Sequence, residues 1–225
     1  MTERPPKQKS NAERAVAVLR DLIFNGDLPA GSNHLEAELA SRLNMSRTPI
    51  REAALILQAQ GLVELRPRKG IRVLPVSLQD MQDIYDILTE LESFAAECAA
   101  ERGLSACDLS ELERAIDDMD KSVANGDLET WAEADDRFHS ELARLSGNAR
   151  ISAIVGMMND QVRRARALTL FLRPVPEKSN ADHRKVFAAI LAGDATKARD
   201  THKAHRKEAK DVIISLLSKH RLSQL

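Results

Sequence analysis

The sequence predicts a mainly α-helical protein, with an N-terminal winged helix-turn-helix domain and a C-terminal all-α helical bundle. Two observations predict this class. Apolar residues recur at three- and four-residue spacing along most of the chain, as one buried face of a helix requires. The strand-like alternation is confined to a short hairpin near residues 62–74, and glycine or proline breakers divide the remainder into helical segments.

Length and composition favour two soluble domains. The 225 residues exceed one ordinary domain of about 100 to 150 residues. No apolar run approaches the roughly 18 to 20 residues that a membrane span needs, and the two cysteines suit a reducing compartment. We therefore expect a cytoplasmic protein without a membrane partner. Its expected parts are a flexible tail at 1–10, a DNA-binding domain at 11–74, a linker at 75–77 and a helical domain at 78–225.

The first domain is expected to contain three helices, at about residues 11–24, 35–43 and 47–60. Ser46 is a favourable N-cap for the third helix, and Pro49 fits its first turn because the missing N–H is not needed there. Two short alternating runs, 62–65 and 71–74, flank a glycine-containing turn and predict a hairpin. Three helices followed by a hairpin form a winged helix-turn-helix.

The second domain is expected to be helical throughout. Periodicity predicts six helices, at about residues 78–102, 108–124, 127–146, 149–172, 179–192 and 194–218. Turn-forming residues separate them, at Gly103, Asn125-Gly126, Gly147, Pro174 with Pro176, and Gly193.

Charge and residue type point to DNA as a partner of the first domain. Residues 1–74 carry 12 Lys/Arg against 8 Asp/Glu, whereas residues 75–225 carry 21 against 26. Arg47 and Arg51 are one helical turn apart near the start of the third helix, and either can bond a guanine edge bidentately. Ser46 and Thr48 can bond phosphate oxygens at the same helix end.

The hairpin turn is also basic. Arg66, Arg68, Lys69 and Arg72 stand there without an intervening acid, which suits phosphate or minor-groove contact. Such arginines can instead solvate a surface helix. The ordered set of helix, turn, capped helix and basic hairpin favours DNA binding.

This part of the chain resembles a known family. The stretches 28–32, 35–43, 46–53 and 61–63 are similar to the N-terminal domain of GntR-family bacterial regulators. The resemblance implies a homodimer that binds an operator with an inverted repeat. It implies DNA contacts from Ser46, Arg47, Thr48, Pro49, Arg51, Arg68, Lys69 and Gly70. Some relatives carry an arginine where Ala37 stands, so that contact is expected to be absent.

The second domain contains candidate metal ligands. Asp135 and His139 are four residues apart, so both side chains leave one face of one helix and can converge on an ion. Asp136 and His202 are competing candidates. A single helical histidine is more often structural than a ligand.

The segments Asp135-Asp136-Arg137-Phe138-His139 and Asp182-His183-Arg184, followed by His205, resemble the FadR-type C-terminal domain called FCD, in the six-helix form of the VanR subgroup. That resemblance implies a divalent metal ion held by Asp135, His139, His183 and His205. Three imidazoles and one carboxylate suit zinc best, with nickel, manganese or iron as alternatives.

The resemblance further implies a small organic acid as effector. Many relatives carry an arginine four residues before the Glu of the first bundle helix, where this chain has Leu88 before Glu92. By sequence, the nearest basic candidates for an effector clamp are Arg163, Arg164 and Arg166.

The sequence therefore predicts a transcriptional repressor that responds to an effector, and not an enzyme. A metal-dependent hydrolase or oxidase is the alternative, but no general-base motif, nucleophile elbow, P-loop or dinucleotide fingerprint accompanies the histidines. A purely structural metal with effector control elsewhere is a third reading.

Overall fold

The computed structural model describes residues 10–220 and divides into two compact units. One unit ends at Val76 and the other begins at Ser77. The tail predicted at residues 1–10 lies outside the described residues, apart from Ser10. None of the described helices combines the length and apolarity needed to cross a membrane.

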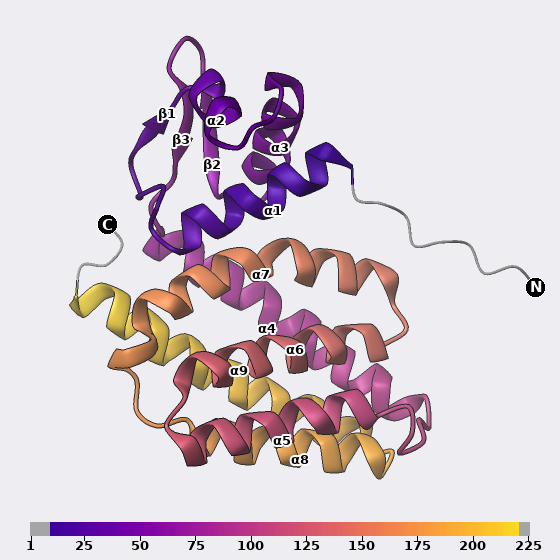
Figure 1. The fold of residues 1–225 in the computed structure, drawn as a ribbon. Helices are drawn as coiled ribbons and strands as arrows, with labels where there is room; N and C mark the ends of the chain where they lie inside the picture. The colour runs from indigo at the N-terminus through magenta and orange to yellow at the C-terminus, as the bar shows by residue number, and fades with distance from the viewer. Residues whose placement is uncertain (1–9, 221–225) are drawn as a thin grey trace, which may run out of the picture. The chain divides into compact units, whose positions relative to one another are not determined.

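The first unit has the winged helix-turn-helix architecture that the sequence predicts (Figure 1). Its elements are α1 (Asn11–Phe24), β1 (Asn33–His34), α2 (Glu36–Arg42), α3 (Arg47–Ala59), β2 (Val63–Arg66) and β3 (Gly70–Val73). The antiparallel sheet has the order β1-β3-β2. Strand β1 was not predicted, because two residues are too few to show the alternation of apolar and polar side chains that marks a strand.

Helix α1 begins at a capping box. The Glu13 amide donates to Ser10 Oγ at 3.1 Å, and the Ser10 amide donates to Glu13 Oε2 at 2.7 Å. The apolar face of α1 then packs on α3, so that the core of this unit is formed by buried side chains that include Ala15, Leu19, Ile23, Ile50 and Leu57. Burial of this face fixes α3 against α1 and leaves the polar N-terminal end of α3 at the surface.

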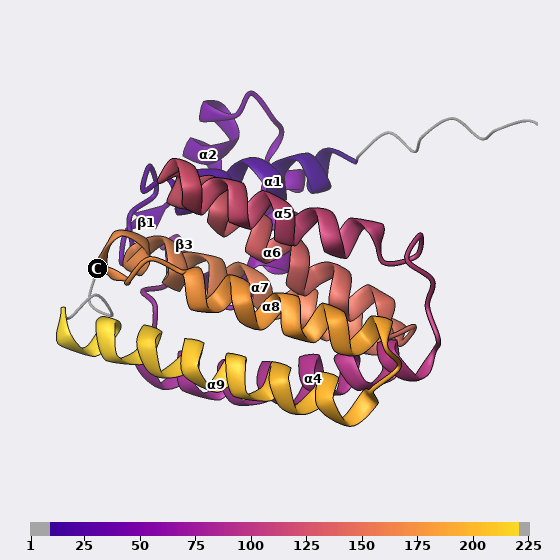
Figure 2. The same cartoon turned by 90° about the horizontal axis from the view of Figure 1, so that it is seen from below.

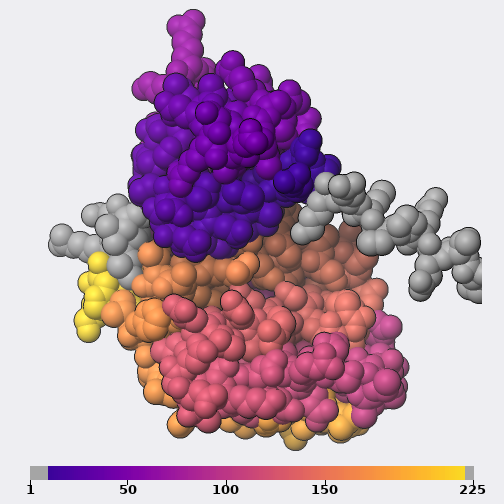
Figure 3. Space-filling model, in the orientation of Figure 1, coloured from indigo at the N-terminus to yellow at the C-terminus, as the bar shows by residue number. Residues whose placement is uncertain are grey.

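The turn between β2 and β3 projects from the first unit (Figure 3). It is closed by a hydrogen bond from the Lys69 amide to the Arg66 carbonyl at 3.1 Å. Arg68 lies inside it with φ +64°, in the left-handed region that non-glycine residues rarely occupy. Gly70 has φ +80°, and a Cβ there would lie 2.3 Å from the His34 carbonyl oxygen. The residue after the turn must therefore be glycine for β1 to pair with β3.

The second unit is a bundle of six α-helices within the described residues. They are α4 (Leu78–Glu101), α5 (Ser110–Asn125), α6 (Leu128–Leu145), α7 (Ala149–Thr169), α8 (Glu177–Leu191) and α9 (Ala195–Lys219). The single helix predicted at 149–172 ends as a 3-10 turn, η1 (Leu170–Leu172), because two prolines follow closely and no regular helix continues. Figure 2 shows α4 and α9 side by side, while α5 packs on α6 and α8.

The bundle core combines apolar side chains with a buried polar cluster. Buried apolar side chains join α4, α5, α6 and α8, and they include Ala96, Leu112, Ile116, Phe138 and Val186. A cluster of buried ionisable groups adjoins them, formed by Glu92, Asp135, His139, His183, His202, His205 and Arg206. Buried polar groups are costly unless they are paired, so this cluster marks the candidate site.

Candidate functional site

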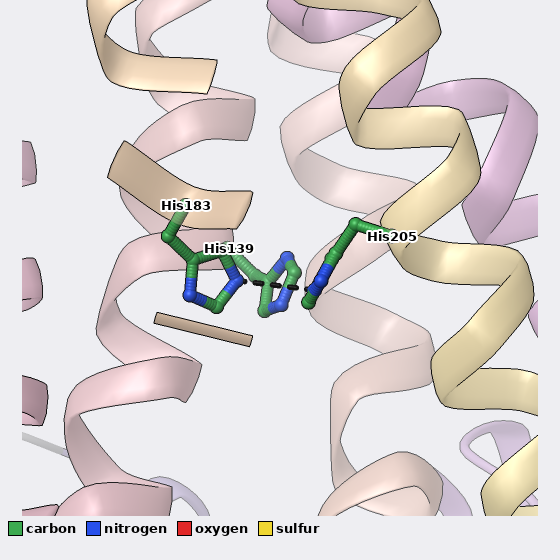
Figure 4. A group of neighbouring side chains, drawn as sticks. All are labelled: His139, His183 and His205. Atoms are coloured by element: carbon green, nitrogen blue, oxygen red, sulfur yellow. Dashed lines mark hydrogen bonds between the residues drawn. The ribbon is translucent and has the colours of Figure 1, made fainter. Parts of the chain in front are cut away.

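The polar cluster is assembled from four helices. Figure 4 shows the rings of His139 from α6, His183 from α8 and His205 from α9 turned toward one another. Asp135 joins them because it lies one turn before His139 on α6. The structure thus brings together the four residues that the sequence predicts as metal ligands.

The spacing inside this group is close. The Nε2 atoms of His183 and His205 are 3.1 Å apart, and one potential ligand atom from each of the three histidines lies within 4.8 Å of the others. The Asp135 carboxylate stands beside them. Its Oδ1 lies 3.6 Å from His183 Nε2, and its Oδ2 lies 3.7 Å from His139 Nε2.

The two competing candidates have other neighbours. Asp136 is held by arginines, with Oδ2 3.0 Å from Arg163 Nε and Oδ1 2.6 Å from Arg166 Nη1. His202 is fully buried, and its Nε2 lies 3.5 Å from Glu92 Oε2. Glu92, His139 and His202 form a second close group, so His202 approaches the cluster from the Glu92 side.

For the carboxylate and two of the histidines, electrostatics favour the protonation states that a metal requires. Burial alone would raise the pKa of Asp135, but Arg166 and the neighbouring imidazoles bring this pKa well below its usual range. Burial lowers the pKa of His183 to about 3 and also lowers the pKa of His205. For His139, burial is outweighed by Glu92 and Asp135, which raise its pKa. At neutral pH the group therefore presents an ionised carboxylate and at least two neutral imidazoles.

These residues fit a divalent ion. Zinc–nitrogen bonds of about 2.0–2.1 Å place the nitrogens of neighbouring ligands roughly 3.0–3.4 Å apart. The 3.1 Å separation of the His183 and His205 nitrogens lies in that range. His139 Nε2 is buried and has no hydrogen-bond partner within residues 10–220. An ion between the rings would take its lone pair.

A second layer of charged groups surrounds the four candidate ligands. Glu92 Oε2 lies 2.8 Å from His139 Nδ1 and 3.5 Å from Arg206 Nε, although the first contact lacks the alignment of a hydrogen bond. Arg166 Nη1 lies 2.5 Å from Asp135 Oδ2. Carboxylates and cations in these positions orient metal ligands in many proteins. The burial of Arg206 was not predicted from the sequence, because a basic residue within a basic run suggests a helix face exposed to solvent.

A cavity of about 120 Å³ opens beside the cluster. Asp135 and His205 line it on one side, and Arg166 and Arg173 contribute guanidinium groups. By comparison, one water needs only roughly 10–15 Å³ of such space, so the cavity can hold a small molecule. Of the predicted effector arginines, only Arg166 is a lining residue. The other two, Arg163 and Arg164, lie on α7 outside the lining.

The polar start of α3 lies on the surface of the first unit. Ser46, Arg47, Thr48 and Arg51 are exposed. Ser46 occupies the N-cap position, but its hydroxyl does not cap the helix and is free to contact another group. Pro49 differs from these four, because its ring is buried in the first turn of α3 and so does not share their exposed face.

A groove joins this end of α3 to the wing. Arg47 and Arg51 line it from α3, and Arg66 and Arg68 line it from the β2–β3 turn. Lys69 is exposed at the same turn. Four guanidinium groups around one groove, with Glu36 as the acid in its lining, form a surface suited to a polyanion.

Comparison with known families matches both units. Residues 11–73 match the model of bacterial regulatory proteins of the gntR family. Residues 83–208 match the model of the FCD domain. The two matches fall on the winged helix-turn-helix and on the helical bundle.

Named relatives are bacterial regulators. The chain is 31% identical to an uncharacterized HTH-type transcriptional regulator from Streptomyces ambofaciens, over 91% of this chain and 86% of that protein. It is 30% identical to a probable D-xylose utilization operon transcriptional repressor from Paenarthrobacter nicotinovorans, over 76% and 75%. It is 24% identical to the HTH-type transcriptional repressor RspR of Escherichia coli, over 94% and 92%.

Solved structures share the fold. A putative transcriptional regulator GntR from Rhodococcus sp. RHA1 superposes with a TM-score of 0.72 at 25% identity, covering 92% of this chain and 99% of that one. Escherichia coli McbR/YncC superposes with a TM-score of 0.76 at 20% identity, covering 92% and 98%. The second likeness concerns the fold alone.

Proposed function

Because the chain belongs to the GntR family of bacterial transcriptional regulators and carries an FCD domain, we propose that a small organic acid controls its affinity for operator DNA. We place the acid beside a divalent metal ion in the bundle. The observation that carries this proposal is the convergence of Asp135, His139, His183 and His205, of which Asp135 and His205 also line a cavity. Two relatives are named as repressors, which supports repression as the output.

In this proposal the four side chains would hold the ion. When bound, the ion supplies a Lewis-acidic partner for an oxygen of the effector. Zinc suits the donor set best, and nickel, manganese and iron also accept imidazole and carboxylate ligands. Arg166 fixes the Asp135 carboxylate, and Glu92 faces the second nitrogen of His139.

The DNA-binding half of the proposal assigns roles by position. Arg47 and Arg51 reach base edges from α3, while Arg68 and Lys69 of the wing contact phosphates. Two copies of the chain related by a two-fold axis would read the two halves of an inverted repeat. Effector binding would change how these two copies are held on DNA. Allosteric couplings of about 1–3 kcal/mol alter affinity roughly 5- to 150-fold, which is enough to release a repressor.

The test measures operator affinity of the full chain, stripped with a chelator or loaded with zinc, across a panel of small organic acids. We expect at least one acid to change the affinity only when zinc is bound. His183→Ala should lose zinc binding and this response, whereas His220→Ala, an exposed histidine on the same bundle, should retain both. Unchanged operator affinity under every condition would contradict effector control.

The same experiment tests the structural-metal reading. If the ion only stabilises the bundle, His183→Ala will lower the melting temperature and leave the acid response intact in the folded fraction.

The roles on DNA are tested by alanine substitutions. Arg51→Ala should weaken binding by about 1–3 kcal/mol and relax the preference at one base position. Lys69→Ala should weaken binding to all sequences alike and reduce the salt dependence by about one counterion. Equal losses of specificity in the two variants would contradict this division.

A further inference from the structure

We propose that Arg173 anchors the effector and that the effector is a small monocarboxylate with an apolar body. The inference rests on the proposed function, because it concerns the cavity beside the same four candidate ligands. It is carried by two features of that cavity: the partners of its cations and the chemistry of its walls.

Arg173 is the lining cation whose charge is not matched. It follows η1, and its Nε and Nη2 atoms donate to Thr169 Oγ1 at 3.0 Å and 2.7 Å. No carboxylate lies within 4 Å of its guanidinium in the part of the chain that the structure describes. A hydroxyl accepts hydrogen bonds but does not neutralise a cation. Burial lowers the pKa of Arg173 to about 10, which leaves it charged at neutral pH.

The other two cations of the lining already have acidic partners. Arg166 bridges Asp135 and Asp136 at 2.5 Å and 2.6 Å. Lys178 is 3.1 Å from an oxygen of Asp182 and also contacts Glu208. An incoming anion would have to displace these contacts to reach either cation. At Arg173 it would replace only contacts with a neutral hydroxyl.

The cavity walls determine which chemistry the rest of the ligand should have. Trp131, Pro174, Val175 and Val212 give the cavity apolar surface, against which a hydrocarbon body can pack. Asp182 and Glu208 also line it, and both are already paired with Lys178. A second carboxylate on the ligand would have no further unmatched cation among the lining residues, because Arg166 and Lys178 already face acids. The cavity therefore selects a single carboxylate.

Butyrate and benzoate are the probes, each compared with its neutral amide, and succinate serves as a dianion. Trp131 is the sole tryptophan of the chain and lines the cavity, so its fluorescence reports binding without any DNA. We expect each monocarboxylate to bind roughly 10- to 100-fold more tightly than its amide, as a charge-assisted contact requires. Succinate should bind less tightly than butyrate.

Three variants isolate the anchor. Arg173→Gln should weaken monocarboxylate binding roughly 10- to 100-fold and abolish the preference over the amide. Arg173→Lys should restore part of that preference, because it keeps the charge without the planar fork. Arg144→Gln is the matched control, since this exposed arginine pairs with Glu141 away from the cavity, and it should bind like the wild type. Melting curves verify that each variant is folded.

The outcomes separate this inference from the proposed function. Probe binding that depends on Arg173 but leaves operator affinity unchanged supports the anchor and contradicts effector control. Loss of binding in Arg164→Gln but not in Arg173→Gln overturns the anchor and leaves effector control standing. Equal affinity for acid and amide, or no binding of any probe to the wild type at millimolar concentration, also overturns the anchor.

Discussion

Replacing Glu92 by glutamine removes one negative charge from the centre of the bundle with little change of shape. The carboxylate is 1% exposed, faces His139 Nδ1 at 2.8 Å and lies 3.5 Å from Arg206 Nε. An imidazole that binds an ion through Nε2 keeps its proton on Nδ1, and Glu92 is close enough to accept a hydrogen bond from it once the ring and the carboxylate align. The substitution should therefore disturb both the metal site and the fold.

The two effects have different magnitudes. Loss of an outer carboxylate that orients a ligand typically weakens metal binding about 10- to 100-fold. Among residues 10–220, Glu92 supplies the carboxylate that lies within 4 Å of the buried Arg206. Breaking a buried ion pair costs about 3–5 kcal/mol. At roughly 2–4 °C per kcal/mol, the melting temperature should fall by about 6–20 °C.

Zinc affinity by chelator competition and thermal melting of the metal-free protein measure the two effects. Glu97→Gln is the matched control, because Glu97 lies on the same helix and pairs with Arg199 at the surface. That variant should shift stability by about 0.5 kcal/mol or less and leave zinc affinity unchanged. Adding Arg206→Met to Glu92→Gln should recover stability but not zinc affinity. If Glu92→Gln behaves like Glu97→Gln in both assays, the reasoning is wrong.

Two further predictions concern the wing and pH. Gly70→Ala should destabilise the wing and weaken DNA binding, because the new Cβ would clash with the His34 carbonyl oxygen. Gly31→Ala is the control, since Gly31 has the same φ of +80° but open space around it. Thermal melting and DNA titration of both variants separate the effect of the clash from that of the backbone conformation. Metal-free protein should lose stability as pH falls below about 6.5. The unfolded chain then takes up protons on histidines that stay neutral and buried in the folded state, and each such histidine lowers the free energy of unfolding by up to about 1.4 kcal/mol per pH unit. The histidines of the bundle with lowered pKa are His183, His202 and His205. His139 opposes them, because its raised pKa adds stability at low pH that is lost as pH rises. Melting curves between pH 7.5 and 5 give the balance, and a melting temperature that rises on acidification would contradict the prediction.

The helices were predictable because their signals are local. Apolar periodicity, Gly126 after α5 and Gly193 after α8 mark element ends within the sequence itself. The observed helix bounds differ from the predicted ones by two residues or fewer, except that α7 ends at Thr169 and not at residue 172. The strand β1 was not, because its pairing with β3 joins residues far apart in the chain.

The candidate site shows the same division. The four-residue spacing of Asp135 and His139 is a local signal, whereas the arrival of His183 and His205 could be inferred only through a resemblance. Arg173 gave no signal at all. It lies beyond the end of α7, and its neighbours in space are set by how α6, α8 and α9 pack around the cavity.

If Arg68 contacts DNA as proposed, stability and DNA binding favour different residues at this position of the wing. Its left-handed backbone would be relaxed by glycine, and such conformations cost other residues roughly 1–3 kcal/mol. Glycine at position 68 would favour thermal stability but would remove a guanidinium from the groove. With the proposed contact, replacing this arginine by glycine would make the loop more stable and would weaken DNA binding.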